Sequence, residues 1–141
     1  MIREGGDMSG EDNPKSVPAA AVLEASKEML QKQLYAIFTR PVDGLGPVFA
    51  NIEEHLKFQV ELERAGVMFA AGPMWTDDEQ SWEGEGLVIV RAENRAAAIA
   101  IAERDPMHKS GARSFDVRPW LVNEGTVSVR LDYSTQTFTI S

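Results

Sequence analysis

The order of patterned segments between residues 33 and 122 restricts the fold more than any other feature of the chain. Four segments have the apolar runs or the alternation typical of β-strands, and they span 33–39, 67–74, 87–90 and 114–122. Two segments carry apolar residues at helical spacing, and they span 47–65 and 95–104. The order β-α-β-β-α-β predicts an α+β, ferredoxin-like domain, in which an antiparallel sheet has two helices on one face.

Glycine and proline mark the ends of several of these segments. Pro47 suits the first turn of the first helix, and Gly66 ends that helix. Pro106 cannot continue the second helix, and it holds Asp105 before it toward extended backbone. Because proline donates no hydrogen bond, Pro119 predicts that the last strand is broken near this residue, which favours an edge position or an exit from the sheet.

The second face of the sheet has no helix left to cover it. In the first strand, Leu34, Ala36 and Phe38 alternate with Tyr35 and Ile37, so both faces carry apolar residues. Exposed apolar surface of that extent usually marks an interface. We therefore predict a homodimer, in which a second copy packs against the uncovered face.

The two ends of the chain lie outside this pattern. Residues 1–18 mix glycine and proline with charged residues, which predicts a disordered tail. Residues 19–32 predict an accessory helix, and residues 33–122 form the α+β domain. Residues 123–141 contain two alternating stretches, which predict a C-terminal extension built as a hairpin.

The composition excludes several classes of function. The 141 residues include 14 Lys and Arg against 22 Asp and Glu, a net charge of −8, which argues against binding to nucleic acid or to an anionic membrane. The chain has no Cys, and therefore no disulfide, thiol nucleophile or Cys-based metal site. Since no run suits a transmembrane helix or a signal peptide, we expect a cytoplasmic protein.

Both histidines of the chain lie where proton transfer could use them, since the pKa of free imidazole is about 6.5. His55 lies in the first predicted helix, at the margin of its apolar stripe, and is either a pocket residue or a packed or surface histidine. Asp105 is either its carboxylate partner or a turn residue before proline. His108 either lines the same pocket or is a solvated loop residue. Since no local histidine spacing suggests a metal, no metal site is predicted.

A series of short motifs, taken in order, resembles the YCII-related (YciI-like) family. The motifs are His55-Leu56, Glu63-Arg64-Ala65-Gly66, Phe69-Ala70-Ala71-Gly72-Pro73-Met74, Gly86-Leu87-Val88-Ile89-Val90, Asp105-Pro106 and Val117-Arg118-Pro119-Trp120. The resemblance covers about residues 33–122. The chain departs from the commonest family form at His108, where the family does not require a histidine.

The resemblance implies a dimeric α+β barrel with a pocket between helix and sheet. His55 matches the family histidine and Asp105 the aspartate of the Asp-Pro motif, a pair proposed to move protons. The best-understood relatives act on small ring compounds by elimination, without a redox cofactor, and related dimeric-barrel folds include isomerases. We therefore expect His55, Asp105 and His108 to be catalytic, with no cofactor.

Candidates for substrate binding lie around the same pocket. Arginine binds a carboxylate or phenolate through two hydrogen bonds, Gly-Pro shapes a pocket wall, and tryptophan stacks on rings. The predicted substrate-binding residues are Arg40, Gly72, Pro73, Met74, Arg118 and Trp120. Further candidates are Arg113, Trp75 and Trp82. The acidic loop 75–86 is either a solvated surface loop or a lid.

Together these patterns predict a small-molecule enzyme, a lyase or isomerase that moves a proton on a small acid, aromatic or lactone-like metabolite with a His–Asp dyad. An alternative is a dimeric, non-catalytic module that binds or senses a small acid. A third possibility is an interaction protein whose added helix and hairpin recruit a partner. Unchanged turnover in a His55→Ala variant would exclude the first of these.

Overall fold

The computed structural model describes residues 13–141, and the chain divides into two compact units. The sheet unit is Gln33–Leu121, and the terminal unit includes residues 13–32 and Val122–Ser141. The predicted tail at residues 1–18 lies outside the described residues up to residue 12. No helix in the described part of the chain is long and apolar enough to cross a membrane.

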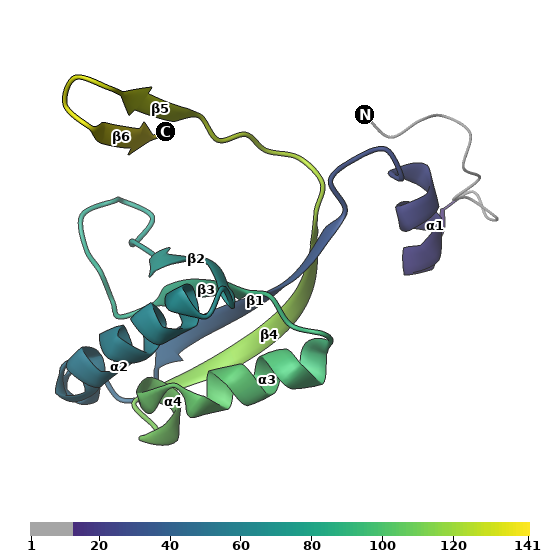
Figure 1. Ribbon diagram of the computed structural model, residues 1–141. Helices are drawn as coiled ribbons and strands as arrows, with labels where there is room; N and C mark the ends of the chain where they lie inside the picture. Colours follow the sequence, from purple (N-terminus) through teal and green to yellow (C-terminus); the bar gives the residue numbers. More distant parts are fainter. Residues whose placement is uncertain (1–12) are drawn as a thin grey trace. The chain divides into compact units, whose positions relative to one another are not determined.

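The sheet unit is built on four strands, which Figure 1 shows as one twisted layer. The strands are β1 (Lys32–Pro41), β2 (Met68–Pro73), β3 (Gly86–Val90) and β4 (Arg113–Val122). They lie in the order β2-β3-β1-β4, and β3 is antiparallel to both of its neighbours. This order and the helices between the strands confirm the predicted α+β, ferredoxin-like fold.

Three helices complete the sheet unit: α2 (Gly46–Arg64), α3 (Arg95–Arg104) and the short α4 (Pro106–Lys109). Asn94 caps α3 by accepting a hydrogen bond from the Ala97 amide at 2.8 Å. Gly66 follows α2 at a φ of 73°, the conformation that glycine adopts at least cost. α2 and α3 lie on the same side of the sheet (Figure 1), and the Arg104 guanidinium lies 5.6 Å from the centre of the Phe58 ring between them.

The structure differs from the expected elements around two prolines. The segment after Pro106 is a helix rather than a loop, because the Asp105 side chain accepts a hydrogen bond from the Met107 amide and so begins a new helical turn. β4 continues through Pro119 without a break. It is an edge strand, where a missing amide proton on the unpaired side costs no ladder hydrogen bond.

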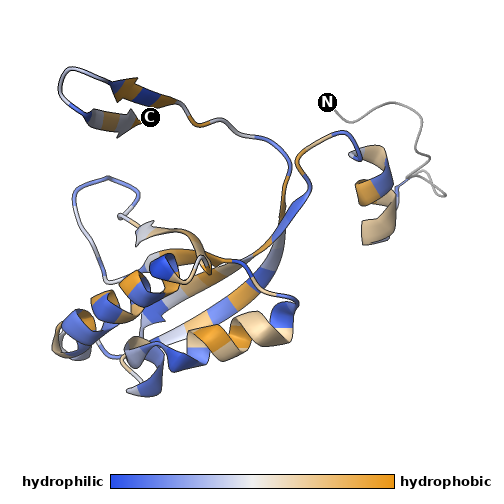
Figure 2. Ribbon diagram, viewed as in Figure 1, coloured by the Kyte–Doolittle hydropathy of each residue, from blue (hydrophilic) through white to orange (hydrophobic). Residues whose placement is uncertain are grey.

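The main core lies between the sheet and α3. Figure 2 shows apolar residues along α3 between its charged ends. Their small alanine side chains allow the helix backbone to approach the sheet closely, and burial of each larger apolar side chain contributes about 1.5–3 kcal/mol. The buried members of this cluster are Tyr35, Ile37, Val88, Val90, Ala98, Ala102 and Val117.

The opposite face of the central strands is less open than the sequence suggests. Leu34, Ala36 and Ile89 are all buried within the chain. Large exposed apolar side chains lie instead on the outer strands, at Phe69 of β2 and Trp120 of β4. The homodimer therefore stays a prediction, and the surface available to it includes the edges of the sheet.

The terminal unit contains one helix and one hairpin. α1 (Ala19–Ala25) buries none of its residues, and the Ser26 hydroxyl donates to the Val22 carbonyl at its end. β5 (Val129–Asp132) and β6 (Thr137–Ile140) pair as an antiparallel hairpin. The apolar side chains of the hairpin, such as Leu131 and Phe138, are about two-thirds exposed, at 68% and 66%.

Candidate active site

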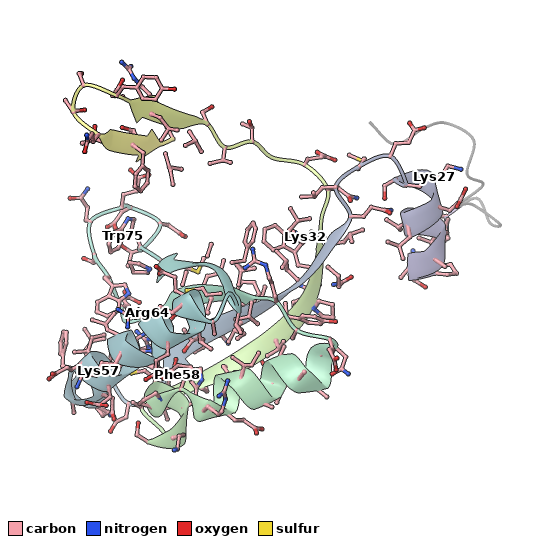
Figure 3. The ribbon with its side chains drawn as sticks, viewed as in Figure 1. Lys27, Lys32, Lys57, Phe58, Arg64 and Trp75 are labelled. Carbon is pink, nitrogen blue, oxygen red and sulfur yellow. The ribbon has the colours of Figure 1, made fainter. Side chains whose placement is uncertain are left out.

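A cavity of about 740 Å³ lies within the sheet unit, between α2 and the sheet. This volume suits a small organic molecule. Its walls come from α2, from β1, β2 and β3, from the first residue of β4 and from the loop between β2 and β3, and they are mainly apolar. Figure 3 labels Trp75 on this loop and Lys57 on α2. Six polar side chains line the cavity: Thr39, His55, Gln59, Glu63, Glu85 and Arg113.

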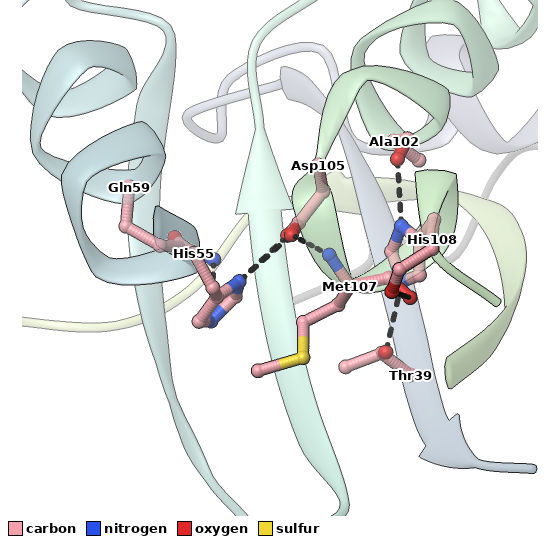
Figure 4. A network of polar contacts seen from close by, with 8 residues as sticks. Thr39, His55, Gln59, Ala102, Asp105, Met107 and His108 are labelled. Atoms are coloured by element: carbon pink, nitrogen blue, oxygen red, sulfur yellow. Dashed lines mark hydrogen bonds and ion pairs between the residues drawn. The ribbon is translucent and has the colours of Figure 1, made fainter. Parts of the chain in front are cut away.

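His55 and Asp105 form a buried hydrogen-bonded pair at the cavity wall (Figure 4). The distances from His55 Nδ1 to the two carboxylate oxygens are 2.9 and 2.8 Å. The exposed fractions of the two residues are 8% and 4%. A carboxylate only accepts, so Nδ1 carries a proton and donates a hydrogen bond to Asp105. In the neutral form of the ring, the lone pair therefore lies on Nε2.

The same local sequence that ends α3 places Asp105 in this pair. Pro106 stops α3 and leaves Asp105 with extended backbone, at φ −62° and ψ 128°. From there, Oδ1 also accepts a hydrogen bond from the Met107 amide at 2.9 Å. The two interpretations of Asp105, a helix-start residue and a partner of His55, thus describe one side chain.

Gln59 lies one turn after His55 on α2 and contacts the other ring nitrogen. Its amide Nε2 donates to His55 Nε2 at 3.3 Å, which agrees with a lone pair at that atom. The amide oxygen of Gln59 is buried without a hydrogen-bond partner among the described residues. Gln59 therefore lies against the ring nitrogen of His55 that does not bond to Asp105.

His108 reaches the cavity only through another residue, Thr39 (Figure 4). His108 Nδ1 donates to the Ala102 carbonyl at 2.6 Å, so Nε2 accepts from the Thr39 hydroxyl at 2.9 Å. The ring also lies 4.5 Å from that of Phe115. Burial lowers the pKa of His108, and Arg113 and His55 act in the same direction, against Asp105 and the bond to Ala102. His108 is thus held neutral, and it fixes Thr39 as a hydrogen-bond acceptor toward the cavity.

Arg113 lines the cavity from the first residue of β4, with 6% of its surface exposed. Its guanidinium lies 5.8 Å from the centre of the Trp82 ring. Burial lowers the pKa of Arg113, and Asp105 opposes this shift. The alternation of β4 puts residues 113, 115 and 117 toward the helices, so this parity identifies Arg113 rather than Arg118 as the arginine near the cavity.

The other expected substrate-binding residues divide into two groups. Gly72 and Pro73 line the cavity, as do Trp75 and Trp82. The remaining ones do not line it, and they are Arg40, Met74, Arg118 and Trp120. Arg40 instead forms an exposed ion pair with Asp116 at 3.4 Å, because it lies at the outer end of β1. Sequence reasoning missed Thr39 and Gln59, and the helical spacing of four residues from His55 is the one signal that could have identified Gln59.

The residues suited to hold metal ions do not gather in the described part of the chain. Within residues 13–141, there is no group of three or more His, Asp or Glu side chains close enough together to form a metal site. The polar groups of the cavity instead suit the binding of an organic molecule. They offer one basic nitrogen, one hydroxyl acceptor and one guanidinium.

A four-stranded sheet in this order, with a ligand-sized cavity beneath α2, defines an α+β domain of the ferredoxin-like class. Within that class, the chain belongs to the YCII-related domain family, whose model matches residues 33–121. No curated protein matches the chain.

A solved structure supports the same fold. It is 5-chloro-2-hydroxyhydroquinone dehydrochlorinase from Burkholderia phenoliruptrix AC1100, in complex with 2,5-dihydroxybenzoquinone. The two chains are 22% identical, with a TM-score of 0.51, and the match covers 62% of this chain and 92% of the other. At this identity the likeness describes the fold alone.

Proposed function

We propose that the protein is a small-molecule enzyme, a lyase or isomerase that needs no redox cofactor, with His55 as its general base. The observation that carries this proposal is the hydrogen bond from His55 Nδ1 to Asp105, which leaves the basic Nε2 at the wall of an apolar cavity. A carboxylate that holds one ring nitrogen fixes the tautomer and stabilises the imidazolium that forms. A solvated histidine has neither advantage.

In an elimination from a hydroxylated ring, the substrate displaces the Gln59 amide from His55 Nε2. The ring first takes its keto form, in which the carbon that carries the leaving group has gained the proton of one hydroxyl. His55 Nε2 then takes the proton of a second hydroxyl, the O–H electron pair forms a C=O bond, the adjacent ring double bond shifts, and the leaving group departs with the electron pair of its own bond. The imidazolium carries the extra proton beside the Asp105 carboxylate until it is returned to water. In an isomerisation, Nε2 takes a proton from one carbon of the substrate and returns it to another.

The solved relative favours elimination on a small ring. Its name describes the removal of hydrogen chloride from a chlorinated hydroxyhydroquinone, and its ligand is a dihydroxybenzoquinone. The cavity in this chain has the volume for one such ring, and Trp75 and Trp82 in its wall can stack on it. We therefore propose a small aromatic or quinone-like substrate, with Gly72 and Pro73 shaping the wall.

The test starts with 5-chloro-2-hydroxyhydroquinone and related hydroxylated rings as trial substrates. Release of chloride, or exchange of a carbon-bound deuterium with solvent, reports proton transfer without knowledge of the natural product. We expect His55→Gln to lower the rate about 10²–10⁴-fold, the usual contribution of a general base. Lys57→Gln is the matched control, since Lys57 pairs with Glu53 and Glu54 on the exposed side of the same helix.

A second candidate, a module that binds a small acid without converting it, has one observation in its favour: the buried Arg113 in the cavity wall. In that case ligands would raise the thermal stability while no product forms.

Equal rates for wild-type protein and His55→Gln on a compound that is converted would exclude His55 as the base.

A further inference from the structure

Arg113 is a buried cation whose guanidinium donors have no acceptor among residues 13–141. A guanidinium has five N–H donors and stays protonated in proteins. The side chain of Arg113 makes no hydrogen bond or ion pair with any described residue, and its Nε is buried without a partner. Leaving a buried donor unpaired is unfavourable, and more so for a charged group. The acceptor that such a group requires is therefore missing from residues 13–141.

The surroundings hold the guanidinium in place without satisfying its donors. Trp82 offers the face of its ring to the cation at 5.8 Å, an attraction that uses none of the N–H groups. Trp82 is itself fixed, because its indole N–H donates to the Glu85 carbonyl at 2.8 Å and its ring contacts Phe49 edge-on. Arg113 is thus positioned in advance at the wall of the cavity, as binding without reordering requires.

The other charges of the cavity do not replace the missing acceptor. Asp105 raises the pKa of Arg113 from a distance, but its carboxylate oxygens bond to His55 and to the Met107 amide. Glu63 and Glu85 also line the cavity, but both are exposed, so solvent screens their charges. The positive charge that a ligand meets inside the cavity is therefore that of Arg113.

We propose that the cavity binds its ligand through a negatively charged oxygen, a carboxylate or an ionised phenol, that pairs with Arg113. The inference rests on the proposed function only in taking this cavity as the substrate site. It names the substrate class: a small ring compound that carries an oxyanion at one end. The apolar walls cover the ring, and Arg113 fixes its orientation toward His55.

Pairs of probes that differ only in charge test this assignment. Binding of benzoate and of benzamide is measured by calorimetry for the carboxylate, and binding of 4-nitrophenolate and of 4-nitroanisole for the phenolate. We expect at least one anion to bind about tenfold or more tightly than its neutral partner. The preferred pair then identifies which oxyanion the site takes.

Two variants show whether Arg113 carries the preference. Arg113→Met should remove the advantage of the anion and keep binding of the neutral probe, whereas Arg113→Lys should retain part of it. Arg40→Met is the matched control, because the Arg40 guanidinium lies outside the cavity and pairs with Asp116. Circular dichroism verifies that each variant is folded, and if Arg113→Met is not, the Arg113→Lys result and the wild-type probe pairs decide.

His55→Gln separates this inference from the proposed function. If Arg113 binds an oxyanion, His55→Gln should keep the preference for the anion even where it has lost turnover. Two results overturn the inference: neither anion binds better than its neutral partner, or Arg113→Met keeps the wild-type preference. The inference is also overturned if none of the four probes binds to the wild-type protein at millimolar concentration.

Discussion

Thr39 carries no sequence motif, yet it is the residue through which His108 acts on the cavity. Its hydroxyl donates to His108, so its lone pairs can only accept a hydrogen bond from a ligand. His108 was expected among the catalytic residues, but its two ring nitrogens are both used within the protein. This geometry favours a role in positioning Thr39, and the catalytic assignment of His108 stays a prediction.

The lowered pKa of His108 gives a prediction for stability against pH. The unfolded chain binds a proton on His108 below about pH 6.5, while the folded chain resists it, so the unfolded state is favoured as the pH falls. The stability that depends on a neutral, buried His108 is therefore fully present above about pH 6.5, and it is lost as the pH falls below that value. We expect His108→Gln to destabilise the protein by about 1–3 kcal/mol at pH 7.5, through the lost hydrogen bonds, and by less at pH 5.5.

Urea unfolding of both proteins at the two pH values measures this difference. The charges that act on His108 are those of Asp105, Arg113 and His55, and they are present in both proteins, so their own effects largely cancel. A gap between wild type and variant that does not shrink at the lower pH would contradict a neutral, buried His108.

The sequence predicted those residues of the candidate site that are marked by local structure or by a family motif. The pairing of His55 with Asp105 follows from the family motif, and the extended backbone of Asp105 follows from Pro106. Thr39 and Arg113 are different, because their roles depend on side chains 69 and 31 residues away, at His108 and Trp82. No local pattern records such contacts, and the sequence named Arg113 only as one of several candidate arginines.

At the scale of elements, the helices were the easiest to predict because their ends are chemically marked. α3 occupies Arg95–Arg104 as expected, with the Asn94 cap before it and Pro106 after it. α1 is shorter than its predicted range, since Ser26 bonds back to the Val22 carbonyl and the helix stops at Ala25. The short α4 was missed, because the cap that begins it depends on the Asp105 side chain.

The loop between β2 and β3 packs closely against Pro41 and Leu45 at Gly84. Gly84 has a φ of 87°, and a Cβ added there would lie 2.5 Å from Pro41 and 2.6 Å from Leu45. We expect Gly84→Ala to destabilise the protein by about 1–3 kcal/mol, through backbone strain and overpacking. Since Trp82 lies in the same loop, binding of anions at Arg113 should weaken as well.

Gly44→Ala is the control for the loop, and chemical denaturation compares the two variants. Gly44 also has a positive φ, 62°, but an added Cβ would meet nothing within 4 Å. The control therefore reports the backbone cost alone, and the excess in Gly84→Ala reports the contact with Pro41 and Leu45. Equal losses in the two variants would show that the loop does not press on these side chains.

At the scale of the whole molecule, we expect the chain to form a homodimer. The exposed Phe69 and Trp120 on the outer strands are large apolar side chains that an interface would bury. Light scattering at micromolar concentration should give twice the 15.6-kDa mass of the chain. A monomer under these conditions contradicts the prediction, and Trp120→Lys tests whether β4 takes part, by lowering the dimer fraction.

The double duty of the Asp105 carboxylate has a consequence for how this family changes over evolution. Asparagine begins a helix as well as aspartate does, so Asp105→Asn should spare α4 while it removes the charge beside His55. A member that has lost its reaction would still be selected to keep a polar residue before Pro106, simply to fold. Under the proposed function, the Asp-Pro pair is therefore a weak marker of activity, and the histidine on α2 is the stronger one.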